Sequence, residues 1–189
     1  MKLLLFALLL ISLVGCGNDE TDTLGTVTVS SSIPSSFFTA KRPDGVKDLV
    51  EVKKTAKKGD EVTFLARIGG RKNASFVPTL AMMIIADPGL ISCEIMSNAE
   101  DHCATPEDYC CEDPELYAKG LGTVRFMDEM GDVYPFSVEG AHGLELLKYI
   151  VVKGTVNDIN ENGLFIVDAN KIWVGGKPRF GDERAGSGE

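Results

Sequence analysis

The alternation of apolar and polar residues predicts mainly β structure in the second two thirds of the chain. In residues 61–68, apolar side chains fall mostly on every second position, which is the period of a half-buried strand. An Asn162-Gly163 pair, a strong hairpin-turn signal, separates the last two strand-like segments. One short helix is predicted over residues 46–57 with Asp44 as its cap. The remaining predicted elements are strands at residues 79–86, 123–127, 134–138, 149–156 and 164–174, and helical turns at residues 144–148.

The order of these segments resembles that of OB-fold domains. Residues 59–70 run from a Gly-Asp turn through the first strand into a glycine pair, and residues 151–156 with residues 164–174 look like the last hairpin of such domains. The resemblance covers roughly residues 59–174. It implies a mainly β, five-stranded Greek-key barrel, in which residues 134–138 would be a short companion to the third strand. Such a resemblance implies a fold and leaves the function open.

The first residues have the layout of a secretory signal. A single positive charge, Lys2, precedes an apolar run over residues 3–14, which is too short to cross a hydrocarbon core of about 30 Å. The junction Leu13-Val14-Gly15-Cys16 resembles the lipobox of bacterial lipoproteins. This resemblance implies that residues 1–15 are a cleaved signal peptide and that the thiol of Cys16 carries lipid, with acyl chains such as palmitate. We therefore predict a lipid-anchored, periplasm-facing protein of the cell envelope, and Gly17, in place of an aspartate, favours the outer membrane.

Composition divides the rest of the chain and limits its partners. Residues 16–43 are rich in small polar side chains and are predicted to form a lipidated tether, residues 44–174 the OB-like domain, and residues 175–189 a disordered tail. Without the leader, 18 basic side chains face 28 acidic ones, a net charge of −10. A surface of this charge repels phosphate backbones, so nucleic acid is excluded as a partner.

A long insertion, residues 88–121, separates the second predicted strand from the third. From Glu94 through Glu115 it carries eight carboxylates and neither lysine nor arginine. In an oxidising compartment, the favoured hypothesis is a pair of disulfides that staple the insertion. The pairing stays open, although a ring between the adjacent Cys110 and Cys111 would be strained. The four cysteines concerned are Cys93, Cys103, Cys110 and Cys111.

The alternative hypothesis for the insertion is a metal site. Thiolates with an imidazole are ligands for zinc or Cu(I), and acidic surroundings favour a cation. The spacing, however, lacks the two-residue-separated cysteine pairs of recognisable zinc sites. The candidate ligands are Cys93, His102, Cys103, Cys110 and Cys111. A reactive, exchanging thiol is disfavoured, because neighbouring carboxylates raise a thiol pKa.

The predicted function is a non-catalytic binding or assembly module, and not an enzyme. The sequence contains no Gly-rich phosphate loop, no serine nucleophile elbow and no paired catalytic carboxylates. The run Asp108-Tyr109-Cys110-Cys111 also resembles uncharacterised planctomycete-type lipoproteins, a resemblance that implies no activity. Membrane lipid is one predicted partner, through acylated Cys16, and an envelope protein is another. Residues 79–86 have two apolar faces, so we expect the insertion or such a partner to cover the outer one.

Overall fold

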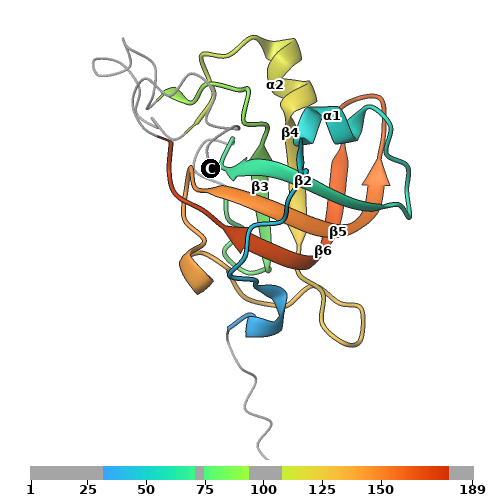
Figure 1. Cartoon of the computed structure of the whole chain (residues 1–189), viewed down its shortest axis with the longest axis vertical. Helices are drawn as coiled ribbons and strands as arrows, with labels where there is room; N and C mark the ends of the chain where they lie inside the picture. Colours follow the sequence, from blue (N-terminus) through green and yellow to red (C-terminus); the bar gives the residue numbers. More distant parts are fainter. Residues whose placement is uncertain (1–31, 71–74, 94–107, 179–189) are drawn as a thin grey trace, which may run out of the picture.

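The computed structural model describes residues 32–70, 75–93 and 108–178, which form a closed β barrel (Figure 1). The barrel strands are β2 (Glu61–Ile68), β3 (Met82–Ala86), β4 (Leu121–Arg125), β5 (Tyr149–Ile159) and β6 (Phe165–Val174). They pair in the order β2-β3-β4-β6-β5, and an additional β2–β5 pairing closes the sheet. The β4–β6 pairing is parallel and the other four pairings of the barrel are antiparallel. This arrangement confirms the predicted OB-like Greek-key barrel and places the cysteine-rich insertion between its second and third strands.

The alternation along the strands explains which side chains fill the barrel. In β2, Phe64, Ala66 and Ile68 are fully buried in the core. In β5, Gly154 lies at a bulge, where a Cβ would meet Val167 Cγ1 at 2.6 Å and the carbonyl oxygen of Asp168 more closely still. A larger residue would therefore push β5 away from β6, which is why this strand carries a glycine at that point.

The apolar strand β3 has one inner and one outer face, as predicted. Ala81, Met83 and Ile85 are fully buried and belong to the core of the barrel. Met82 and Ile84 point outward and are half-buried, and Leu80 just before the strand is 37% exposed. The outer face is therefore partly covered.

The helices differ from the predictions in length and place. Helix α1 (Leu49–Lys53) is shorter than the predicted 46–57, and its N-cap residue is Asp48 instead of Asp44. The residues before it form β1 (Lys47–Asp48), which pairs in parallel with β2. This pairing holds the chain extended where the sequence pattern favoured a helix, so tertiary contact overrides local propensity.

Three further segments were wrongly assigned or missed. Residues 134–138 do not form a strand; the preceding chain makes only an isolated bridge between Met127 and Val133. The predicted helical turns at 144–148 are replaced by a 3₁₀ turn, η4 (Ala141–Gly143). Helix α2 (Pro114–Gly120), inside the insertion, was not predicted; its N-cap is Asp113, whose carboxylate accepts hydrogen bonds from Glu115 N at 2.8 Å and Leu116 N at 3.1 Å.

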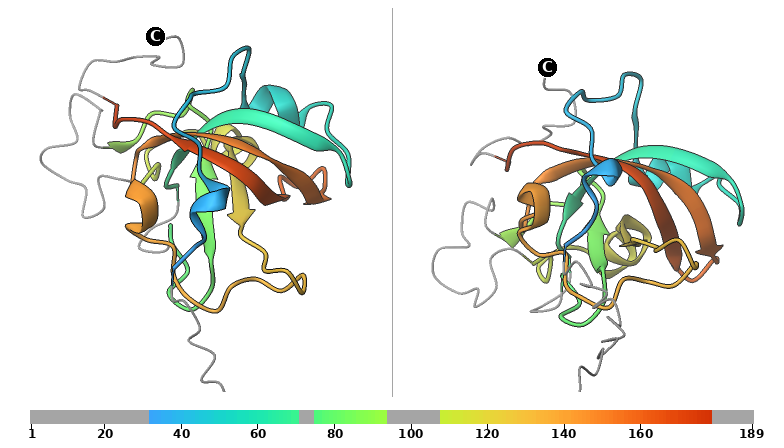
Figure 2. Two further views of the ribbon diagram at one scale, coloured as in Figure 1. Left: turned by 60° about the horizontal axis from the view of Figure 1, so that its bottom comes forward. Right: turned by 90° about the horizontal axis from the view of Figure 1, so that it is seen from below.

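Both ends of the folded domain extend beyond the predicted limits. Residues 33–43 do not hang free as a tether, because Ile33 is 1% exposed and Thr39 N donates to the carbonyl of Ile172 in β6 at 3.0 Å. Figure 2 shows this segment, with the 3₁₀ turn η1 (Ser35–Phe37), lying beside β6. At the other end, Gly175 and Gly176 continue the pairing with Tyr149 instead of starting a tail. The apolar side chains Ile33, Phe37 and Phe38 explain the first correction, because they reach the core.

Several predictions concern residues outside the described ranges. These are the signal peptide, the lipidated Cys16, most of the tether and most of the tail, together with His102 and Cys103 of the insertion. Within the described residues, no helix has both the length and the apolar character needed to cross a membrane.

Candidate functional site: a cluster of three thiols

The two described ends of the insertion meet beside the barrel and bring three cysteines together. Cys93 lies seven residues beyond β3, and its N–H donates to the carbonyl of Asp108 at 2.9 Å. Cys110 and Cys111 follow two residues later, just before the Asp113 cap of α2. Because the cap and the Pro114 that follows it define where the helix begins, they also set the position of the adjacent thiols.

The sulfur atoms of this thiol cluster (Cys93, Cys110 and Cys111) lie at metal-ligand spacing. The Sγ atoms of Cys93 and Cys110 are 3.5 Å apart, those of Cys110 and Cys111 are 4.0 Å apart, and all three lie within 4.8 Å of one another. Four sulfurs bound to zinc at about 2.3 Å in a tetrahedron are roughly 3.8 Å apart, and a disulfide brings its sulfurs to about 2.05 Å. The distances of 3.5 and 4.0 Å are closer to the first arrangement than to a disulfide bond. Cys93 is fully buried, whereas Cys110 and Cys111 are exposed, so the cluster opens to solvent on one side.

The structure thus brings together three of the five predicted ligands. No disulfide bond joins any two of the three described cysteines. Cys103 and His102 lie outside the described residues, so the predicted pairings with Cys103 and the predicted imidazole ligand stay predictions.

A buried arginine under the insertion was not predicted from the sequence. The Arg67 side chain, 1% exposed, extends from β2, and its Nη2 donates to the carbonyl of Pro88 at 3.3 Å and to that of Leu90. Its guanidinium lies 5.4 Å from the ring centre of Tyr109 and 5.7 Å from that of Tyr149. Burial raises the pKa of Tyr109 to about 12, although the positive charge of Arg67 opposes this shift. Arg67 and Tyr109 therefore hold both arms of the insertion against the barrel, next to Cys93 and Cys110.

A lysine in α1 forms hydrogen bonds with the C-terminal end of α2 and with the β5–β6 turn. Lys53 in α1 donates from Nζ to the carbonyl oxygens of Lys119 at 2.7 Å, Leu121 at 2.6 Å and Gly163 at 3.1 Å. Burial lowers the pKa of Lys53 to about 8, and the nearby charge of Asp87 partly opposes this. The sequence analysis did not single out this role, because the three acceptors are backbone groups far away along the chain.

The carboxylate of Asp87 closes the end of β3. Its Oδ2 accepts from Val50 N at 2.7 Å and its Oδ1 from Gly89 N at 2.7 Å, in the turn that follows the strand. Burial raises the pKa of Asp48, and the charge of Asp87 adds to this effect. The two acidic groups therefore lie in a structural junction between α1 and β3.

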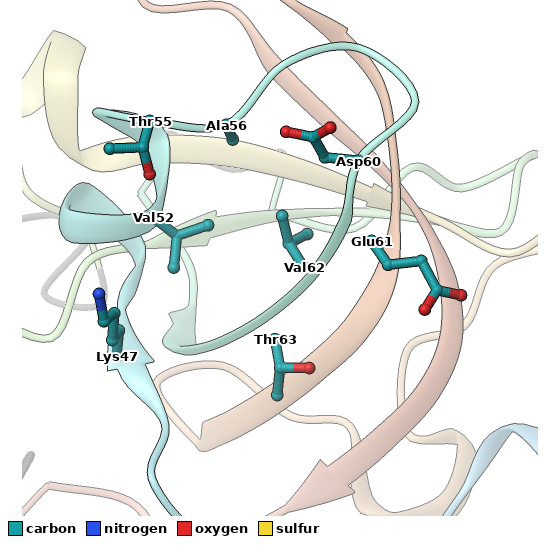
Figure 3. A pocket seen from close by; sticks show the side chains of 8 residues that line it. All are labelled: Lys47, Val52, Thr55, Ala56, Asp60, Glu61, Val62 and Thr63. Carbon is teal, nitrogen blue, oxygen red and sulfur yellow. The ribbon is translucent and has the colours of Figure 1, made fainter.

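A shallow groove between α1 and β2 offers no convergent chemistry. Its volume is about 340 Å³, and Figure 3 shows Val52 and Val62 at its centre, with the carboxylates of Asp60 and Glu61 pointing in different directions. Asp60 already accepts a hydrogen bond from Lys57 N at 2.9 Å, as the turn requires. We assign no site to this groove.

Comparisons of the chain with protein-family models, with curated proteins and with solved structures find no match. The strand order alone identifies the fold as an OB-like barrel. A barrel of this kind serves many unrelated functions, so the function must be argued from the site itself.

Proposed function

We propose that the chain is a lipid-anchored envelope protein whose barrel is a non-catalytic binding module, and that its thiol cluster binds a soft metal ion. The spacing of the three Sγ atoms, all within 4.8 Å, carries the metal part of this proposal. The anchor is supported by the sequence alone, through the apolar leader and the Leu13-Val14-Gly15-Cys16 junction. Two or more acyl chains on Cys16 would give lasting attachment, since each buried CH₂ contributes about 0.8 kcal/mol.

Zinc and Cu(I) are the cations that suit this cluster. Thiolates are soft ligands, and three of them satisfy a trigonal Cu(I) ion or three positions of a tetrahedral zinc ion. The next residues along the chain add negative charge, since Glu112 and Asp113 follow Cys111 directly. A bound cation would neutralise the charge of the three thiolates, which would otherwise repel one another.

The roles of the ionisable groups support a binding protein over an enzyme. Arg67 holds the arms of the insertion, Lys53 bonds three carbonyls, and Asp87 and Asp113 bond backbone N–H groups. Each of these groups makes its hydrogen bonds to the protein backbone, in the case of Arg67 through Nη2. They therefore serve the architecture around the cluster.

The test is metal and thiol analysis of the full chain extracted from membranes under anaerobic conditions. We expect about one equivalent of zinc or copper, and thiols that a denaturant and a chelator together make reactive. The Cys93→Ser and Cys111→Ser variants should lose the metal. Glu129→Gln, which removes an exposed carboxylate outside the insertion and keeps every thiol, is the matched control and should retain it.

The competing arrangement is the predicted pair of disulfides. A shift of the Cys93 and Cys110 side chains would bring their sulfurs from 3.5 Å to bonding distance. Protein that contains no reactive thiol, has the mass of a doubly oxidised chain and carries no metal would overturn the metal site and leave the stapled insertion in its place.

A further inference from the structure

A second cavity lies on the outer surface of the barrel, away from the insertion. Its volume is about 320 Å³, at the lower end of the range for small-molecule sites, and β2, β5, β6 and the segment before β1 surround it. We call it the lysine groove. Its lining residues are Phe38, Thr39, Lys41, Pro43, Thr63, Val151, Lys153, Lys171 and Trp173.

Positive charge in this groove is concentrated and unusual for the chain. Among the described residues that line it, three are lysines and none has a carboxylate, although the chain has 28 acidic side chains and a net charge of −9. Lys153 in β5 lies directly opposite Lys171 in β6, with Thr63 of β2 on its other side. Like charges placed opposite each other in a sheet are destabilising, so the pair weakens the barrel unless an anion neutralises it.

Existing ion pairs do not offset this charge. Of the three lysines, Lys41 lies 3.9 Å from Asp44, and both side chains are almost fully exposed, where such a pair contributes little. Lys171 Nζ donates to the carbonyl of Ser36, a neutral acceptor. The sheet register thus places Lys153 and Lys171 side by side at the groove, and both side chains are exposed to solvent and to an incoming anion.

A half-exposed tryptophan lies beside the two opposed lysines. Two residues further along each strand, Leu65, Val151 and Trp173 form the next row on the same face of the sheet. Leu65 and Val151 are buried, so Trp173 is the member of this row that stays half-exposed at the groove. The Trp173 ring is fixed from two sides, because the Arg42 guanidinium lies 5.6 Å from its ring centre and Gly175 leaves it room: a Cβ there would lie 2.5 Å from the ring. The groove therefore offers cations on one side and a rigid, half-exposed aromatic surface on the other.

We propose that the lysine groove binds a phosphorylated sugar or polyol. Lysine ammonium groups bind phosphate as point charges, and the half-exposed Trp173 ring is the apolar surface against which the carbon skeleton of the ligand packs. A single phosphate between Lys153 and Lys171 removes their mutual repulsion. This site is independent of the thiol cluster, which lies on other elements, and of any metal.

The only tryptophan of the chain lies in this groove, so intrinsic fluorescence reports on it directly. The experiment titrates the full chain, in detergent, with glucose 6-phosphate, glycerol 3-phosphate and inorganic phosphate. We expect the two organic phosphates to change Trp173 emission saturably, at least tenfold more tightly than inorganic phosphate, with affinity falling as salt rises. The double variant Lys153→Gln/Lys171→Gln should bind at least tenfold more weakly, and Lys58→Gln, a lysine outside the groove, should bind as the unaltered chain does.

A second arm identifies the source of the phosphate. Vesicles with phosphatidylglycerol are compared with vesicles of phosphatidylcholine alone, using the same variants. Binding to phosphatidylglycerol vesicles that depends on Lys153 and Lys171 assigns the phosphate to a lipid headgroup, and binding of the soluble esters alone assigns it to a free ligand. Equal affinity for inorganic and organic phosphate, no response to any of them, a response that survives the double variant, or tighter binding of a single-stranded oligonucleotide would each overturn the proposal.

Discussion

Lys53→Met tests whether one side chain holds α1, α2 and the β5–β6 turn together. Methionine keeps most of the side-chain volume and the helix propensity, and removes the three hydrogen bonds to Lys119, Leu121 and Gly163. The three carbonyls are near solvent and can bind water instead, so each lost bond costs about 0.5–1 kcal/mol. We expect a total loss of about 2 kcal/mol in the free energy of unfolding. For a domain of this size that lowers Tm by roughly 6–10 °C.

The pH dependence of this loss follows from the pKa of Lys53. Folding lowers that pKa from 10.5 to about 8, so between these values the unfolded chain binds more protons than the folded one. The stability of the unaltered protein therefore rises with pH across this window. The stabilisation that comes from the neutral form of Lys53 is complete above pH 10.5 and is lost as pH falls through 8. Because the side chain is half-exposed, we expect solvent screening to limit this contribution to about 1 kcal/mol. The Met variant has no such group, so the stability difference between the two proteins should widen as pH rises.

The assay is urea unfolding followed by circular dichroism at pH 7.0 and pH 9.5. Lys54→Met is the matched control, because Lys54 is the next residue along the chain and its side chain is exposed. This control should change stability by less than about 0.5 kcal/mol at both pH values. The reasoning fails if the difference in stability between the unaltered protein and Lys53→Met is smaller at pH 9.5 than at pH 7.0. That result would show that the three carbonyls stabilise the charged form of Lys53 more than burial destabilises it.

Three other changes test the barrel, the helix cap and the anchor. Gly154→Ala should destabilise the protein by about 1–3 kcal/mol in urea unfolding, since its Cβ would lie 2.6 Å from Val167 Cγ1. The control Gly176→Ala has open space around its Cβ and should unfold as the unaltered protein does. Asp113→Ala removes the cap of α2 and should lower the free energy of unfolding, measured by thermal unfolding, by about 1 kcal/mol. Competition with a chelator should also show weaker zinc binding. If both stability and zinc affinity stay unchanged, the cap does not position the thiols. Cys16→Ser should abolish lipid attachment and membrane association in cell fractionation; a variant that stays processed and membrane-bound would refute the predicted anchor.

The sequence by itself determined the barrel, because strand periodicity and turn residues are local signals. The alternation in residues 61–68 and the Asn162-Gly163 turn correspond to β2 and to the β5–β6 hairpin. The position of the cysteine-rich insertion followed from the same pattern, since it interrupts the strands. The sequence also selected the cysteines as the candidate site by residue type alone.

The tertiary structure alone decided how distant residues combine. Arg67 and Lys53 bond backbone carbonyls that are separated from them along the chain, and no local pattern encodes such a contact. The pairing of Lys153 with Lys171 depends on the register of two strands, and the proximity of Cys93 to Cys110 depends on how the insertion closes. The boundary of the folded domain also depends on tertiary contacts, because Ile33 is buried against core residues that come later in the chain.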